Sequence, residues 1–341
     1  MAEVIWYVDP DATGSGDGDT WENAYTSLSA WEAAEEVDLD TANNWAHVYC
    51  RSSGGGDDTT AVQVNGWTTS ATDYILIESD DDVGGIWDAT KYNLSISGGH
   101  CLWIFEDFVR IKGVQIQLTN TAGTIYGCIY VPGGISATTD LRVWNCVIKG
   151  VISGSGAGVG IYCRDSVNAY GDLKAWNNLV YDFIGGSGAQ YGILSSYFSS
   201  LTLWNNTIQN NAVGIQDDEV SYCDTIAINT LFSDNTADAV GTFAAGTDYN
   251  VTNNASIGYT VTGEGNTHDD VSQTFTFVGD PDFHLDSADV GAKDLGVADP
   301  GSGTYSDDVD GDTRSGSWDC GFDEVVGGGG VAFIPRIMSI T

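Results

Sequence analysis

Short runs of alternating apolar and polar residues recur along the middle of the chain. Five of them align, at residues 109–116 (VRIKGVQI), 141–148 (LRVWNCVI), 173–180 (LKAWNNLV), 201–208 (LTLWNNTI) and, more weakly, 227–232 (AINTLF). The residues at their centres, spaced by 32, 32, 28 and 24 positions, are Gly113, Asn145, Asn177, Asn205 and Asn229. A period of this length is typical of a solenoid, in which each repeat adds one coil to a stack.

A second phrase falls between the members of the first. It reads GCIY from Gly127, GIYC from Gly160, GILS from Gly192 and GIQD from Gly214. Two strand types therefore alternate in fixed order, with loops of variable length between them. A propeller blade would need four strands per unit, and a leucine-rich repeat would have a shorter period. The pattern predicts an all-β fold, a right-handed parallel β-helix.

Strand alternation assigns a direction to each side chain of the repeat. We expect stacked aliphatic columns inside the coil, formed by Leu141, Val143, Leu173, Ala175, Leu201 and Leu203. Asn at the centre of the phrase fits a tight bend, because it tolerates left-handed backbone angles. Stacked Asn side chains can also bond to one another in a ladder.

The open ends of such a stack need covers. Residues 27–38 predict a short helix over the first coil, with a Ser29-x-x-Glu32 capping box and with Leu28 and Trp31 facing inward. Strands at 46–51 and 73–79 would begin the stack, and residues 275–283 would close it. The expected organisation is a cap over 1–44, the β-helix over 45–290, a closing segment over 291–326, and a Gly hinge with an apolar peptide over 327–341.

Composition and charge narrow the range of partners. The chain has 44 Gly, 5 Pro, and 48 acidic against 11 basic residues, for a net charge of −37. Nucleic acid and anionic membrane surfaces are excluded as partners, because both are bound through basic residues. The N-terminus lacks the pattern of a signal peptide, and no apolar run reaches the roughly 20 residues of a membrane span. The seven Cys show no Cys-x-x-Cys spacing and are expected to be buried free thiols.

Two outward columns carry the candidate chemistry of the repeats. Arg110, Arg142 and Lys174 share one position, which Thr202 occupies in the next coil. This basic column would meet uronates or sulfates, or else pair with neighbouring acids. Two residues further along stand Trp144, Trp176 and Trp204, which we expect to face outward. A stacked aromatic stripe binds sugar faces, or is covered by another subunit or by a loop.

Both ends of the chain resemble a known family. Residues 6–34 and 45–51 are similar to the entry region of right-handed parallel β-helix repeat proteins of the pectate-lyase-like superfamily. Residues 279–296 and 308–324 resemble the segment that ends many of these proteins. The resemblance implies the fold. It does not imply one activity, since the superfamily contains lyases, hydrolases, viral tailspikes and adhesins.

An enzyme is the alternative interpretation. Polygalacturonase-like hydrolases have paired Asp residues, Gly-His-Gly and Arg-Ile-Lys in that order, whereas here Gly99-His100-Cys101 and Arg110-Ile111-Lys112 precede Asp217-Asp218. The order is wrong, so the constellation is not transferred. Arg142 or Lys174 could still serve a lyase as its base, and Asp217 with Asp218 could act as an acid and base pair. No cofactor is expected except a calcium ion, which Asp308, Asp310 and Asp312 would bind although the bidentate Glu of an EF-hand is missing.

The leading hypothesis is a non-enzymatic surface or structural protein of a virion or extracellular assembly, of the decoration, tail or adhesin type. It would assemble with itself or with neighbouring subunits as a homo-oligomer and would contact polysaccharide. Assembly is assigned to apolar residues after the Gly hinge, which would fill a groove or add a strand on a neighbour. These residues are Val331, Phe333, Ile334, Ile337 and Met338. The alternative is a polysaccharide lyase or glycoside hydrolase acting on an acidic polysaccharide.

Overall fold

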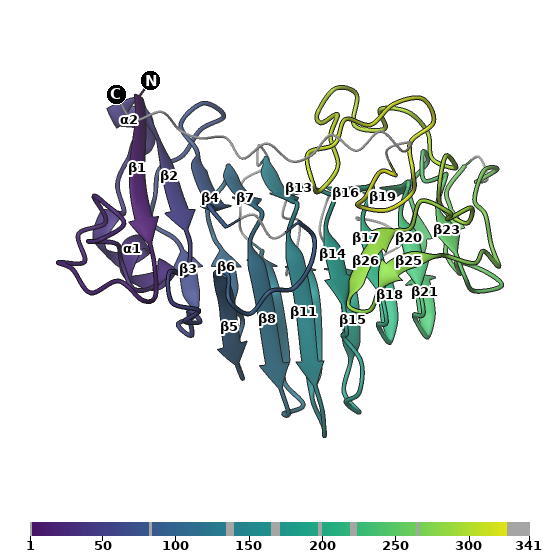
Figure 1. Ribbon diagram of the computed structural model, residues 1–341, viewed down its shortest axis with the longest axis horizontal. Helices are drawn as coiled ribbons and strands as arrows, with labels where there is room; N and C mark the ends of the chain where they lie inside the picture. The colour runs from purple at the N-terminus through teal and green to yellow at the C-terminus, as the bar shows by residue number, and fades with distance from the viewer. Residues whose placement is uncertain are drawn as a thin grey trace.

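The chain forms a right-handed parallel β-helix, as the repeats predict (Figure 1). The computed structural model describes residues 2–81, 84–133, 140–164, 171–196, 200–218, 224–263 and 266–325. Three parallel sheets run along the stack, and from β4 to β21 each coil contributes one strand to each sheet in turn. Within each of these sheets, every strand except the two at the ends pairs with the equivalent strands of the coils before and after it.

The first sheet contains, in spatial order, β1 (Ala2–Val8), β2 (Asn44–Cys50), β4 (Ile75–Ser79), β7 (Val109–Lys112), β10 (Leu141–Trp144), β13 (Asp172–Trp176), β16 (Ser200–Trp204) and β19 (Asp224–Ile228). The second contains β5 (Asn93–Ser97), β8 (Gln115–Asn120), β11 (Val147–Ile152), β14 (Leu179–Tyr181), β17 (Thr207–Gln209), β20 (Leu231–Ser233) and β23 (Val251–Thr252). The third contains β3 (Val62–Val64), β6 (Leu102–Ile104), β9 (Ile125–Pro132), β12 (Ala157–Arg164), β15 (Gln190–Ser196), β18 (Val213–Asp217) and β21 (Ala237–Val240).

The predicted aliphatic columns fill the coil. Leu141 pairs with Leu173, and Leu173 with Leu201. The parallel column consists of Val143, Ala175 and Leu203. All six side chains are at most 2% exposed, so the column positions are core residues. Six cysteines are also buried and free, as expected: Cys50, Cys101, Cys128, Cys146, Cys163 and Cys320. Cys223 lies outside the described residues.

The bend between the first and second sheets has the backbone conformation that the sequence predicts. Its φ values lie between 49° and 66° at Gly113, Asn145, Asn177, Asn205 and Asn229. The amide ladder, however, is formed mainly by the residue that follows. Asn206 Oδ1 accepts hydrogen bonds from the backbone N and from Nδ2 of Asn178, at 3.1 and 2.9 Å. Among the bend residues, Asn229 Nδ2 donates to Asn205 Oδ1 at 3.2 Å.

The N-terminal cap differs from the prediction in two details. Helix α1 (Leu28–Glu35) begins after Ser27, whose side chain accepts a hydrogen bond from the backbone N of Ala30, so Ser27 and not Ser29 is the N-cap. Leu28 and Trp31 are fully buried and cover the coil as expected. The stack begins earlier than residue 45, because β1 pairs in register with β2. A second short helix, α2 (Leu39–Ala42), precedes β2.

The C-terminal part of the chain turns back over the outside of the coils (Figure 1). After the small pair β22 (Thr242–Phe243) and β24 (Thr260–Val261), residues 266–325, here called the return segment, form one antiparallel hairpin and long loops. The hairpin consists of β25 (Phe277–Gly279) and β26 (Asp282–Leu285). No helix within the described ranges has the length and apolar character to cross a membrane.

The outward amides of the bend bind the return segment. Asn177 Nδ2 donates to the carbonyl of Asp307 at 2.8 Å, and Asn229 Nδ2 to that of Val297 at 2.8 Å. Asn205 donates to the carbonyls of Asp319 and Gly321, at 2.7 and 3.1 Å, and accepts from Tyr305 Oη at 2.8 Å. The same residues therefore bend the coil and attach the segment that covers it.

This double role predicts unequal effects at two bend positions. Gly keeps the left-handed backbone, so Asn205→Gly removes only the side-chain hydrogen bonds, and we expect it to lower the free energy of unfolding by about 2–4 kcal/mol. The matched control is Asn145→Gly, where φ is 55° and the amide oxygen has no hydrogen-bond partner in the described part of the chain. That variant should change stability by less than about 1 kcal/mol. Urea denaturation of both variants measures the difference, and equal losses would contradict it.

Candidate functional site

The outer face of the first sheet carries both predicted columns in register. Arg110, Arg142 and Lys174 are paired neighbours, and Thr202 follows them. Trp144, Trp176 and Trp204 form the second column, with Lys112 one coil earlier. The strand alternation therefore places each residue on the face that the sequence indicates.

The basic column is an ion-pair cluster centred on Asp140. Arg142 donates to its carboxylate at 2.6–3.0 Å, and Lys174 Nζ lies 3.4 Å from Asp140 and 2.5 Å from Asp172. Arg110 lies 3.9 Å from Asp140, with its guanidinium 3.4 Å from the centre of the Tyr74 ring. Burial alone would raise the pKa of Asp140, but Arg142 and Lys174 hold it below its usual range. The cations of this column therefore neutralise the carboxylates of Asp140 and Asp172.

The tryptophan column is largely covered. Trp144 stacks on Trp176 with ring centres 5.0 Å apart, and Tyr305 of the return segment stacks on Trp176 at 5.7 Å. Trp318 packs against Tyr305, and exposure falls to 4% for Trp176 and 8% for Trp204. Of the alternatives for the outward stripe, cover by a loop applies to these two residues, because the return segment packs on their face. Trp144 is half-buried at the end of the stripe.

The candidate acid pair does not share a cleft. Asp217 is 3% exposed and has the same strand phase as the fully buried Ile215. Asp218 follows β18 and is exposed. Successive residues of a strand point to opposite faces, so the two carboxyl groups diverge. This geometry does not provide the facing carboxylates that glycoside hydrolysis requires.

His100 has a structural role on the outer face of the third sheet. Its Nδ1 accepts a hydrogen bond from the backbone N of Gly127 at 2.8 Å, and its ring stacks on Tyr130 at 3.9 Å. Trp103 and Tyr126 contact it edge-on. Burial lowers the pKa of His100 to about 4, so the imidazole is neutral at physiological pH.

The predicted calcium residues are not brought together. Asp308 is fully buried, and its carboxylate accepts hydrogen bonds from the backbone N of Asp310, Asp312 and Glu324 at 2.8–3.0 Å. These bonds fold the loop around Asp308. Asp310 and Asp312 instead face a different pocket, which Asp308 does not line.

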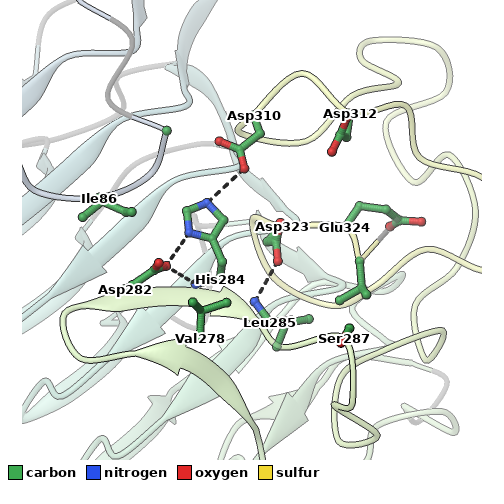
Figure 2. Close-up of a pocket in the computed structure, with 12 residues that line it drawn as sticks. Ile86, Val278, Asp282, His284, Leu285, Ser287, Asp310, Asp312, Asp323 and Glu324 are labelled. Carbon is green, nitrogen blue, oxygen red and sulfur yellow. Dashed lines mark hydrogen bonds and ion pairs between the residues drawn. The ribbon is translucent and has the colours of Figure 1, made fainter. Parts of the chain in front are cut away.

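That pocket has a volume of about 570 Å³ and lies within the return segment beside Gly84 and Ile86 (Figure 2). His284 from β26 is 9% exposed and Asp323 7% exposed, whereas Asp310 is exposed. The side-chain nitrogen and oxygen atoms of these three residues lie within 4.8 Å of one another. They are the described residues best arranged to hold a cation. This group was not identified from the sequence, although the Asp282-x-His284 pair is a signal for it.

The electrostatics of the pocket follow from its burial. Burial alone would lower the pKa of His284, but the carboxylates of Asp323, Asp310 and Asp282 raise it above its usual value. Burial raises the pKa of Asp323 well above that of an ordinary carboxyl. The site therefore favours a positive charge, whether a proton or a metal ion.

A second pocket, of about 480 Å³, lies on the outer face of the second sheet. Its apolar walls are Trp87, Tyr181, Phe277 and Phe283. Lys149 Nζ lies 5.4 Å from the centre of the Trp87 ring, and Asp182 accepts a hydrogen bond from Asn210 Nδ2 at 2.7 Å in the same wall. Sequence reasoning missed this site, because its aromatic residues come from distant parts of the chain.

Comparisons with known proteins assign neither a family nor an activity to the chain. No protein-family model matches the chain, and no curated protein matches it. The crystal structure of pectate lyase Pel9A is similar with a TM-score of 0.40 and 13% identity, over 95% of this chain and 96% of that one. A likeness at this level carries no information about substrate or activity. The β-helix assignment comes from the three parallel sheets themselves.

The low pKa of His100 predicts a loss of stability in acid. Between pH 6.5 and 4 the unfolded chain binds a proton at this residue and the folded chain does not, so stability falls as pH decreases through this window. We expect His100 to contribute up to about 2 kcal/mol of this loss, after allowance for solvent screening. Unfolding of His100→Gln, which does not titrate, should depend less on pH. The exposed His268 provides the control as His268→Gln, and identical pH profiles for His100→Gln and the parent would reject this assignment.

Proposed function

We propose that the chain is a non-enzymatic β-solenoid of a virion or extracellular surface assembly, of the decoration, tail or adhesin type. The supporting observation is the ion pairing of two basic residues on the outer face of the first sheet. Arg142 and Lys174, the candidate bases of a lyase, are bound to Asp140 and Asp172. Abstraction of a proton needs an unpaired base within reach of the substrate, and neither residue meets that requirement.

The charge of the protein is consistent with a solvent-exposed structural role. The chain carries 48 acidic residues against 11 basic ones, and its apolar residues fill the coil. A highly charged surface keeps a rigid solenoid soluble and prevents unspecific association. The same negative charge disfavours the binding of anionic polysaccharides. We therefore expect the protein to bind a neutral glycan.

We assign saccharide contact to the pocket beside Trp87, in place of the covered tryptophan stripe. Aromatic rings pack on the apolar faces of sugars, and polar groups around them bond to hydroxyls. The pocket combines Trp87 and Phe277, both half-buried, with Lys149, Gln209 and Asn210. By contrast, Tyr305 packs on the rings of Trp176 and Trp204.

Assembly remains assigned to Val331, Phe333, Ile334, Ile337 and Met338, which lie outside the described residues. The last described residue is Val325, whose backbone N donates to Asp319 at 2.7 Å. We propose that the apolar peptide beyond it docks on a neighbouring copy or subunit, as an added strand or in a groove.

Incubation with neutral and uronate polysaccharides tests the absence of catalysis. We expect binding to a neutral glycan, measured by titration calorimetry, and neither unsaturated products nor new reducing ends after prolonged incubation. Arg142→Ala and Lys174→Ala should bind as the parent does. Product formation by the parent that either variant abolishes would establish the lyase instead.

The binding part of this experiment has a matched pair of variants. Trp87→Ala removes the aromatic wall of the pocket and should weaken glycan binding about tenfold. Trp45→Ala removes a half-buried ring from the outer face of the first sheet and should leave the affinity unchanged. Equal affinities of the two variants, or no binding to any glycan of the panel, would reject the Trp87 pocket.

Assembly is tested by a chain that ends at residue 326, which keeps the hydrogen bond of Val325. We expect a smaller oligomer than the full chain forms, by light scattering, at an unchanged melting temperature. A full-length variant with Ser at the five apolar positions separates the effect of apolar character from that of length. If both variants assemble as the full chain does, the peptide has no part in assembly.

A further inference from the structure

Three residues from separate parts of the return segment converge in one pocket (Figure 2). His284 belongs to the hairpin strand β26, Asp310 to the loop around Asp308, and Asp323 to the last described loop. Their ligand atoms lie within 4.8 Å of one another. The three residues are separated in the sequence, so the fold brings them together.

The imidazole of His284 is held in one orientation. Its Nδ1 lies 2.6 Å from Asp282 Oδ1, which also accepts the backbone N–H of His284 at 3.1 Å. In the neutral ring the carboxylate selects the tautomer with the proton on Nδ1, so Nε2 presents a lone pair. A carboxylate bonded to the far nitrogen in this way is the usual support of a metal-bound histidine.

The other nitrogen faces the carboxylate of Asp310 as its ion-pair partner but makes no hydrogen bond to it. Nε2 of His284 is buried and has no hydrogen-bond partner among the described residues. It lies 3.4 Å from Asp310 Oδ2, which is long for a hydrogen bond. Ligand atoms at about 2.0–2.1 Å from a tetrahedral ion are themselves about 3.4 Å apart, so this spacing suits two ligands of one ion.

The charge balance of the pocket favours a cation. Asp282, Asp310 and Asp323 surround a single imidazole, and Asp312 and Glu324 line the same pocket. Arg314, the nearest buried cation of this segment, is bound to Glu324 at 3.2 Å and to backbone carbonyls. Even a protonated His284 leaves an excess of carboxylates, and burying like charges without compensation is costly.

We propose that His284, Asp310 and Asp323 bind a divalent transition-metal ion of the zinc class, with Asp282 as the positioning residue for the imidazole. A nitrogen ligand with two carboxylates suits zinc and its neighbours, whereas calcium prefers an all-oxygen shell. The ion joins the hairpin β25–β26 to the two loops that follow it. This inference stands independently of the proposed function.

Titration of the full chain tests the site. Protein treated with EDTA and dialysed is titrated with Zn²⁺, Mn²⁺ and Ca²⁺ in a calorimeter, and its melting temperature is followed in parallel. We expect one equivalent of Zn²⁺ per chain, binding tighter than Ca²⁺, and a rise of about 5 °C in melting temperature at a hundredfold excess over Kd.

Variants identify the ligands. His284→Gln and Asp310→Asn should each weaken Zn²⁺ binding by more than about tenfold, and Asp282→Asn should weaken it by about tenfold through the orientation of the ring. Asp307→Asn makes the same charge change in the same loop as Asp310 but outside the group, and should bind Zn²⁺ as the parent does. Asp310 is exposed, so its variant should fold even where His284→Gln does not.

Three results would overturn the proposal. The first is no saturable binding of Zn²⁺ or Mn²⁺ by the parent. The second is Zn²⁺ affinity that Asp310→Asn and Asp307→Asn reduce equally, which would indicate general charge attraction. The third is Ca²⁺ binding that is tighter than Zn²⁺ binding and unaffected by His284→Gln.

Discussion

The structure depends on one backbone constraint, a left-handed residue at the bend between the first and second sheets, which five successive coils share from Gly113 to Asn229. At Asn145, Asn177, Asn205 and Asn229 this conformation is occupied by the residue type that tolerates it best after Gly. Repetition at the same place makes successive coils superimpose, because a shift of one residue would reverse every inward and outward side chain. The aliphatic columns and the two outward columns follow from this register.

The same constraint explains why the outer face is covered. The left-handed bend directs amides out of the coil, where an unpaired donor would remain unless something bound it. The carbonyls of Asp307, Asp319 and Val297 accept from these amides. Arg314 adds a buried link, with Nη2 donating to Asn177 Oδ1 at 3.1 Å. These bonds fix the return segment across the tryptophan column. Pockets form where the return segment meets the coils.

The features that the repeat determines could be predicted from the sequence. Those that the return segment determines could not. Period, phase and bend angle are local properties, so the positions of Leu141, Lys174 and Trp204 on their faces could be predicted. The burial of Trp204 could not, because the residue above it, Tyr305, is about a hundred positions away. Asp308 illustrates the opposite error: its carboxylate looks like a metal ligand in the sequence, but in the structure it accepts three backbone hydrogen bonds.

Charge and fold together restrict where chemistry can occur. Ten of the 11 basic residues lie in the described part of the chain, and ion pairs within that part involve six of them: Arg51, Arg110, Lys112, Arg142, Lys174 and Arg314. The remaining surface is therefore dominated by carboxylates, whose field attracts cations and repels anionic ligands. Three pockets of the described residues each take part of their lining from the return segment. The contact between the return segment and the coils combines concavity with buried titratable groups, and it is there that we propose selective binding, with the coil as the scaffold.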